Sequence, residues 1–154
     1  MRRITLLPSA AAVGVLLAGC GGSDFDRGSL VEDPVTVTTL TAAQVDAGTA
    51  ASGLQALSGK AKCDVKVVAL NYNTIGPRGE ETNSSGVMMV PGGACSGAAA
   101  LVAYAKGTDV QKPRTLANPA DGEAFLLAAM YAAQGYAVVA PDYLGYAKSK
   151  FSYH

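Results

Sequence analysis

The sequence has no tryptophan, a single histidine and no surplus of charge of either sign. Its 12 basic and 12 acidic residues cancel, and charged residues make up only 16% of the chain. The basic residues are scattered and form no stripe that could neutralise a phosphate backbone, so we expect no nucleic-acid partner. Apolar residues make up 49% of the 154 residues, which is typical of a chain that builds a packed core. The length suffices for one ordinary domain, or for part of a larger one.

The sequence also lacks an apolar run long enough to cross a bilayer. Residues 4–17 are apolar and follow two arginines, a pattern that predicts a signal peptide over residues 1–19. The segment at 17–20, Leu-Ala-Gly-Cys, resembles the bacterial lipobox. This resemblance implies that Cys20 becomes the first mature residue and carries acyl groups that anchor it to a membrane. Gly21, the residue directly after this cysteine, resembles the residue at the same place in lipoproteins that are sent to the outer membrane. The alternative is an ordinary cleaved signal with an unmodified Cys20, and in both cases the protein is exported to the periplasm or beyond.

Only two cysteines remain besides Cys20. Export implies an oxidising compartment, so Cys63 and Cys95 are interpreted as a disulfide. Strand-like runs at 64–73 and 85–91 flank a segment rich in turn residues. A hairpin centred near residue 79 sets position 63 opposite position 95. The alternative, two unpaired small buried thiols, stays open at this point.

The pattern after the leader predicts a tether followed by one helix. Residues 20–40 form the expected lipidated N-terminus and flexible tether, because the part up to residue 33 is rich in Gly, Ser and Asp. The domain proper is expected over residues 41–154. Thr41 and Gln44 have the spacing of a capping box, which predicts a helix from Ala42 to about Leu57.

A second group of elements follows the hairpin. Residues 98–105 form an apolar run that ends at a loop and predicts a buried strand. Residues 121–134 have helical spacing, with Gly135 at the place of a left-handed C-terminal residue. Residues 136–140 form another continuous apolar strand. Two strands without polar alternation around a helix predict a parallel βαβ unit covered on both faces, and thus an α/β fold opened by an antiparallel hairpin.

Two segments carry a family resemblance. Residues 135–149, GYAVVAPDYLGYAKS, look like a strand and the following loop with the pattern P-D-Y-x-G-x-G-x-S, in which Ala147 replaces the last Gly. Residues 104–108, YAKGT, resemble an H-G-T turn with Lys106 in place of the His. Both patterns occur in bacterial secreted α/β-hydrolases related to secretory lipases and esterases. The resemblance covers residues 63–154 and implies the N-terminal portion of an α/β-hydrolase-type sheet.

The resemblance also implies a chemistry. A member of this family hydrolyses carboxylic esters with a serine nucleophile and no cofactor or metal, and its substrate is a lipid or small ester. The turn would contribute to the oxyanion hole, with Thr108 N–H as a donor and Gly107 allowing close approach. The alternative for this turn is a plain strand-to-helix connection. Asp142 is interpreted as a turn residue rather than a catalytic acid. Tyr143, Tyr146 and Tyr153 are expected near the substrate cleft.

The catalytic triad of such an enzyme is missing from these residues. No serine has glycines at both flanking places of G-x-S-x-G, and the only histidine is His154, which matches an H-P-Y segment before the nucleophile in the family. We therefore expect a chain truncated before the nucleophile elbow, inactive alone, and poorly soluble because the strand at 136–140 would lose a neighbour.

Two other functions stay open. The first is a complete small lipoprotein of the periplasm or outer membrane that binds a ligand or partner without catalysis. The second is another use of the same fold, such as a peptidase or an acyl transferase, because a fold does not select a chemistry.

Overall fold

A computed structural model describes residues 25–152 as one five-stranded sheet with helices. The predicted leader, Cys20, Tyr153 and His154 lie outside the described residues. The elements in chain order are β1 (Val35–Leu40), α1 (Ala42–Ser52), α2 (Gln55–Ser58), β2 (Asp64–Ile75), β3 (Glu81–Gly92), η1 (Gly93–Cys95), β4 (Leu101–Ala103), α3 (Gly122–Met130), η2 (Ala132–Gln134) and β5 (Ala137–Pro141), where η marks a 3-10 helix. The strand order is β1-β2-β3-β5-β4.

The long antiparallel hairpin of β2 and β3 is the centre of the sheet. Its register runs from Asp64 opposite Gly92 to Ile75 opposite Glu81, so its midpoint lies at residue 78, one residue from the prediction. The disulfide between Cys63 and Cys95 is confirmed, with the two Cα atoms 5.4 Å apart. Cys95 reaches this position through the short turn η1, which offsets the shift in register.

The expected tether over 20–40 is wrong in its last part. Residues 35–40 form β1, which pairs antiparallel with β2 from Val35 opposite Ala69 to Leu40 opposite Val65. The sequence VTVTTL explains this, because β-branched residues favour strands. Leu30 also makes an isolated bridge to Tyr72, so the segment before β1 already follows the sheet.

The capping box at the start of α1 is confirmed. Gln44 N–H donates to Thr41 Oγ1 over 3.2 Å, and Thr41 N–H donates to Gln44 Oε1 over 2.8 Å. The helix is shorter than predicted, however. Gly53 has a φ of 74°, and this left-handed residue ends α1 before the separate turn α2.

The predicted helix at 121–134 is present in two pieces. Asp121 caps α3 by accepting from the N–H groups of Glu123 and Ala124. The helix is interrupted at Tyr131, where ψ and φ depart from helical values, and continues as η2. Gly135 ends it in the predicted left-handed conformation, with a φ of 101°.

The two apolar strands lie side by side and parallel, as predicted. Leu101 pairs with Ala137 and Ala103 with Val139. The prediction that 98–105 is a long buried strand is wrong, because β4 has only three residues and Leu101 is 63% exposed. The prediction that the strand at 136–140 loses a neighbour is wrong as well. β5 lies between β3 and β4, and the edges of the described sheet are β4 and β1.

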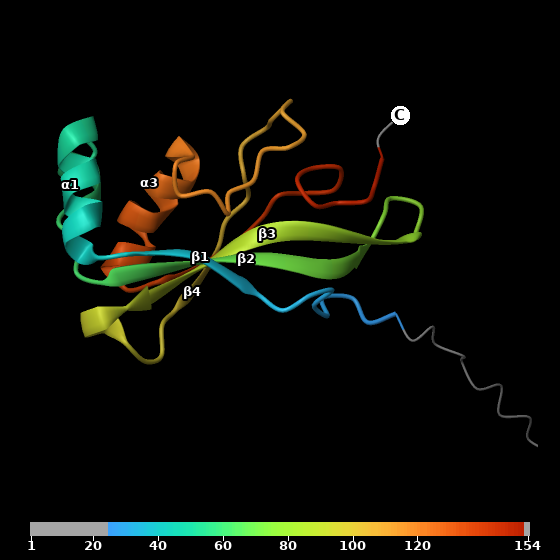
Figure 1. The fold of residues 1–154 in the computed structure, drawn as a ribbon, viewed down its shortest axis with the longest axis horizontal. Coiled ribbons are helices and arrows are strands. Elements are labelled where there is room, and N and C mark those ends of the chain that lie inside the picture. Colours follow the sequence, from blue (N-terminus) through green and yellow to red (C-terminus); the bar gives the residue numbers. More distant parts are fainter. Residues whose placement is uncertain (1–24, 153–154) are drawn as a thin grey trace, which may run out of the picture.

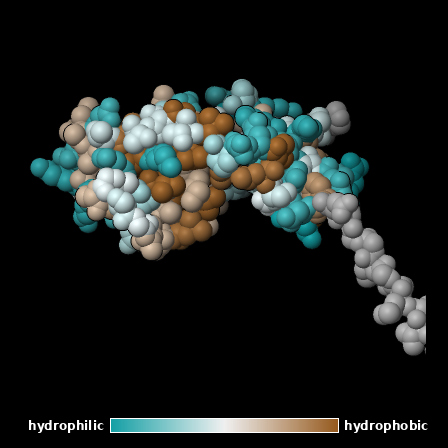
Figure 2. Space-filling view, turned by 60° about the horizontal axis from the view of Figure 1, so that its bottom comes forward, coloured by the Kyte–Doolittle hydropathy of each residue, from teal (hydrophilic) through white to brown (hydrophobic). Residues whose placement is uncertain are grey.

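Among residues 25–152 the helices cover only one face of this sheet, so the predicted cover on both faces is wrong for this part of the chain. Figure 1 shows α1 and α3 on the same side, and the buried core joins Val45 of α1 and Leu127 of α3 to Val67 and Val138 of the strands. Because side chains alternate along a strand, Val139 points to the opposite face, where it lines an apolar pocket of about 300 Å³ with Leu30, Leu70 and Tyr72. Figure 2 shows the apolar surface on this side. Within residues 25–152 no helix is of a length and hydropathy that would cross a membrane.

Candidate active-site pocket

The loops that follow the two parallel strands form one pocket. It has a volume of about 680 Å³, and its lining comes from the loop after β4 and the loop after β5: Lys106, Gly107, Thr108, Asp109, Tyr143, Leu144 and Tyr146. The carboxyl ends of neighbouring parallel strands lie at the same edge of a sheet, which explains why these loops meet. The structure therefore brings together the two segments that carried the family resemblance.

The glycine turn lines this pocket, and its two backbone N–H groups differ in their contacts. Gly107 N–H donates to Glu123 Oε1 over 2.9 Å. Thr108 N–H has no hydrogen-bond acceptor within the described residues, and both Gly107 and Thr108 are exposed. An N–H without an acceptor, in a turn that is fixed on one side, can donate a hydrogen bond to a ligand oxygen without rearrangement of the protein. The geometry of the turn is thus compatible with the predicted donor, Thr108.

Lys106 joins the two loops beneath the pocket. Its side chain is 0% exposed, and its Nζ lies 3.3 Å from Asp109 Oδ2 and 4.3 Å from the centre of the Tyr146 ring. The hydroxyl of Tyr146 donates to the carbonyl of Asp109, and the hydroxyl of Tyr143 donates to the carbonyl of Lys106 over 3.2 Å. The ammonium is buried with a carboxylate and an aromatic face as partners. Lys106 therefore connects the walls of the pocket and does not reach into it.

Arg114 binds three carboxylates behind the glycine turn, which we name the carboxylate cluster: Asp109, Asp121 and Glu123. The distances from its guanidinium nitrogens are 3.0 Å to Asp109, 2.7 Å to Asp121 and 2.7 Å to Glu123. The hydrogen bonds to Asp121, the strongest of these effects, raise the pKa of Arg114 above its usual range. One planar cation with several charge-assisted bonds is a rigid joint. It fixes the loop after β4 against the first turn of α3.

The pKa values of the carboxylate cluster are lowered. For Asp109 the main cause is the hydrogen bond from Gln111 N–H, helped by Arg114 and Lys106. For Asp121 the main cause is the hydrogen bond from Arg114. Burial alone would raise the pKa of Glu123, but bonds from Gly107, Tyr104 and Arg114 outweigh it. All three groups therefore stay ionised to lower pH than ordinary carboxyl groups. No group of three or more potential ligands in residues 25–152 is arranged to hold a metal ion.

Asp142 has a larger structural role than the turn residue predicted from sequence. It is 0% exposed. Its carboxylate accepts from Ser85 Oγ at 2.8 Å, from Thr115 Oγ1 at 2.9 Å and from Leu116 N–H at 2.9 Å. These bonds tie β3 and the long loop before α3 to the end of β5. Because both carboxylate oxygens accept hydrogen bonds from buried groups, Asp142 is a structural anchor: it fixes the start of the loop after β5, which lines the pocket.

The loop after β5 contains two residues in the left-handed region that are not glycine. Tyr143 has a φ of 73° and Ala147 a φ of 49°. Ala147 occupies the last glycine position of the resembled pattern, and its N–H donates to the carbonyl of Lys112 over 2.7 Å. Glycine adopts this conformation without steric cost, which explains the glycine in the pattern. In this chain the loop keeps the conformation through its contacts.

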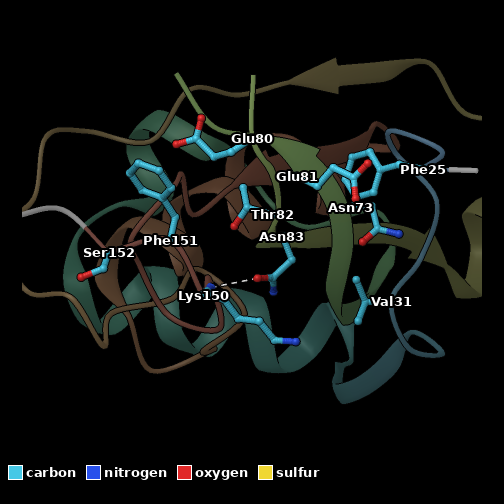
Figure 3. A pocket seen from close by; sticks show the side chains of 10 residues that line it. All are labelled: Phe25, Val31, Asn73, Glu80, Glu81, Thr82, Asn83, Lys150, Phe151 and Ser152. Carbon is cyan, nitrogen blue, oxygen red and sulfur yellow. Dashed lines mark hydrogen bonds between the residues drawn. The ribbon is translucent and has the colours of Figure 1, made fainter. Parts of the chain in front are cut away.

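The chain after this loop returns to the hairpin. Asn83 Nδ2 donates to the carbonyl of Lys148 over 2.9 Å, and Lys150 N–H donates to Asn83 Oδ1 over 2.8 Å. Figure 3 shows the second contact beside a separate pocket of about 480 Å³, where Phe25 and Phe151 lie among polar side chains. This pocket lies near the tip of the hairpin. The two contacts of Asn83 matter for the candidate site because they hold the end of the loop that carries Tyr143 and Tyr146.

Together, the mixed sheet, the helices on one face and the two loops at the parallel strand ends define an α/β fold of the esterase and hydrolase type. The chain is similar to the rice cell wall degrading esterase LipA from Xanthomonas oryzae, with 35% sequence identity and a TM-score of 0.71 over 83% of this chain. A mutant of LipA gives 34% identity and a TM-score of 0.72 over 84% of this chain. These comparisons relate the chain to esterases.

A more distant structure supports the fold alone. A proposed hydrolase from Legionella pneumophila is 22% identical, with a TM-score of 0.68 over 82% of this chain and 33% of its own length. The chain spans about a third of the length of the structures it matches, 32% in the case of LipA. No protein-family model matches the sequence, and a search of curated proteins gives no match either.

Sequence reasoning missed two side chains of the candidate site. It found the glycine turn from its motif but not Glu123 or Arg114, which hold that turn from the next helix and from the long loop. The sequence gives no signal for Arg114, because its three carboxylate partners lie at different distances from it along the chain and form no recognisable motif. For Glu123 a weak signal exists: it is the acidic residue of the first turn of a helix capped by Asp121.

Proposed function

We propose that this chain is the N-terminal part of an exported serine esterase or lipase and that it supplies one donor of the oxyanion hole. The observation that carries the proposal is Thr108, an exposed residue whose N–H has no acceptor within the described residues, in a pocket walled by the loops after β4 and β5. In acyl transfer, negative charge develops on the carbonyl oxygen, and a fixed backbone N–H lowers the energy of that state. The substrate class would be a small carboxylic ester or a lipid.

The proposal includes inactivity of this chain by itself. It has no G-x-S-x-G serine, and its single histidine is His154. A nucleophile and its base would come from a part of the enzyme beyond these residues. The similarity to LipA over about a third of that protein supports this division. Neither a cofactor nor a metal is required for this chemistry.

The test of this proposal is an ester hydrolysis assay on the chain and on a longer product. The expressed 154 residues should not hydrolyse a p-nitrophenyl ester faster than the denatured chain does. A longer reading frame that adds a G-x-S-x-G segment should gain activity, and replacing that serine by alanine should abolish it. Turnover by the 154 residues alone would refute the division, and an unrelated downstream sequence would favour a small ligand-binding lipoprotein.

We also propose export with a lipid anchor on Cys20. The support is the leader at 1–19 and the lipobox-like segment before Cys20, because acyl chains bury methylene groups at about 0.8 kcal/mol each. The disulfide between Cys63 and Cys95 fits an oxidising compartment. Growth of the bacterial host with a palmitate analogue should label the wild type but not Cys20→Ala. Equal labelling of both would refute the anchor.

A further inference from the structure

Glu123 engages one backbone donor of the glycine turn, the N–H of Gly107. Its Oε1 accepts from Gly107 N–H at 2.9 Å and from Tyr104 OH at 2.7 Å. Its Oε2 accepts from Arg114 at 2.7 Å. Thus one carboxylate oxygen holds the turn and the other is held by a guanidinium. The side chain is mostly buried, with 18% exposure.

We infer that Glu123 is a positioning residue for the oxyanion donor, one that acts through Gly107 and does not touch the substrate. The inference rests on the function proposed above. With Gly107 N–H engaged by Glu123, the next N–H along the chain, that of Thr108, has no acceptor within the described residues and belongs to a residue that lines the pocket. A turn with both N–H groups free could rotate and lose the aimed donor.

The charge of Glu123 is compatible with this role because Arg114 compensates it. An unpaired carboxylate close to a developing oxyanion would repel it. Arg114 lies 2.7 Å from Glu123 and 2.7 Å from Asp121, so the negative charge of Glu123 is paired with a cation. The turn requires from Glu123 an oxygen acceptor within hydrogen-bond distance of Gly107 N–H. The length of the side chain should therefore matter more than its charge.

Three substitutions separate the effect of the length of the Glu123 side chain from the effect of its charge. Glu123→Gln keeps the length and one oxygen acceptor. Glu123→Asp keeps the charge at the start of α3 but shortens the side chain by one methylene. Glu123→Ala removes the acceptor. Glu81→Gln is the matched control, since Glu81 is exposed at the start of β3, on the hairpin and outside the glycine turn.

The experiment uses amide NMR on the oxidised full chain, with sodium butyrate as the probe of the turn. At neutral pH, butyrate should shift the Thr108 amide saturably in the wild type. The shorter Asp and Ala variants should bind butyrate about fivefold more weakly, the factor given by one ordinary hydrogen bond. The Gln variant and the Glu81 control should stay within about twofold of the wild type by the same measure.

A second readout reports the contact itself. In the wild type the Gly107 amide should titrate with acid as Glu123 takes up a proton, with a midpoint below the ordinary glutamate value of about 4.3. In Glu123→Gln this titration should vanish while the Thr108 response remains. A general loss of packing would instead move many amides at once.

The outcomes distinguish the two levels of the hypothesis. If butyrate leaves Thr108 unshifted in the wild type, the proposed oxyanion donor is wrong. If the wild type responds but Glu123→Asp binds butyrate as tightly, the positioning role is wrong and the donor stands. If Glu123→Ala fails to fold, the Asp and Gln variants decide the question with the same criteria.

Discussion

Replacing Asp142 by alanine should destabilise the chain strongly, because three interior donors lose their acceptor together. The donors are the hydroxyls of Ser85 and Thr115 and the N–H of Leu116. A buried donor left without an acceptor costs about 1–3 kcal/mol. The hydroxyls can rotate to other acceptors, whereas the Leu116 N–H is fixed by the backbone. We expect a total loss of about 3–5 kcal/mol in the free energy of unfolding, a large part of the stability of a small domain.

Two further variants calibrate this value. Asp142→Asn keeps one oxygen acceptor for Leu116 N–H, and the two hydroxyls can turn to accept from the new amide. Its cost should be about 1–2 kcal/mol. Asp33 is exposed and lies before β1, so Asp33→Ala should change the free energy of unfolding by less than about 0.5 kcal/mol.

The measurement is urea denaturation followed by far-ultraviolet circular dichroism on the oxidised chain. The midpoints should fall in the order wild type, Asp142→Asn, Asp142→Ala, with an unchanged dependence on urea. An Asp142→Ala variant within about 1 kcal/mol of the wild type would show that its bonds add little net stability. The role assigned to this anchor would then be refuted.

Reducing the disulfide between Cys63 and Cys95, which are 32 residues apart, should lower the free energy of unfolding by about 3–4 kcal/mol through loop entropy, and equal urea midpoints with and without reductant would contradict this. Gly86→Ala should cost about 2–3 kcal/mol by overpacking, since its Cβ would lie 2.6 Å from the carbonyl oxygen of Ala140; the control Gly122→Ala, where the Cβ meets nothing, should not destabilise. The carboxylate cluster has lowered pKa values, so its stabilisation is complete above the ordinary values of about 4 and is lost as the pH falls below them. An acid titration of the urea midpoint should show this loss in the wild type and less of it in Arg114→Met.

Local signals in the sequence predicted much of the fold. The capping box at Thr41 and the left-handed Gly135 are short-range features whose chemistry is written in a few neighbouring residues. The pairing of Cys63 with Cys95 followed from the symmetry of one hairpin. The parallel pairing of β4 and β5 followed from two apolar runs around a helix.

Features that depend on distant contacts could not be predicted in the same way. The length of β4 is set by its single neighbour β5, which pairs with three of its residues, although the apolar run of the sequence is longer. The contacts of Asp142 join three separate segments. By contrast, β1 was a missed local signal, because VTVTTL has a clear strand composition.

The same limit applies to the candidate site. The glycine turn at 107–108 could be found from its motif, but the side chain that holds Gly107 comes from a helix that starts well after the turn. Lys106, which departs from the histidine of the resembled motif, is explained only by its three-dimensional partners, Asp109 and Tyr146.

The order of the strands along the chain has a consequence for how the sheet is assembled. Within residues 25–152, β5 is the last strand in sequence, yet it lies between β3 and β4. Until residues 137–141 join the sheet, β4 has no strand to pair with and α3 lacks part of the surface on which it packs. The hairpin with β1 can assemble early, but the turn at 107–108 acquires its final position only when the last strand is inserted.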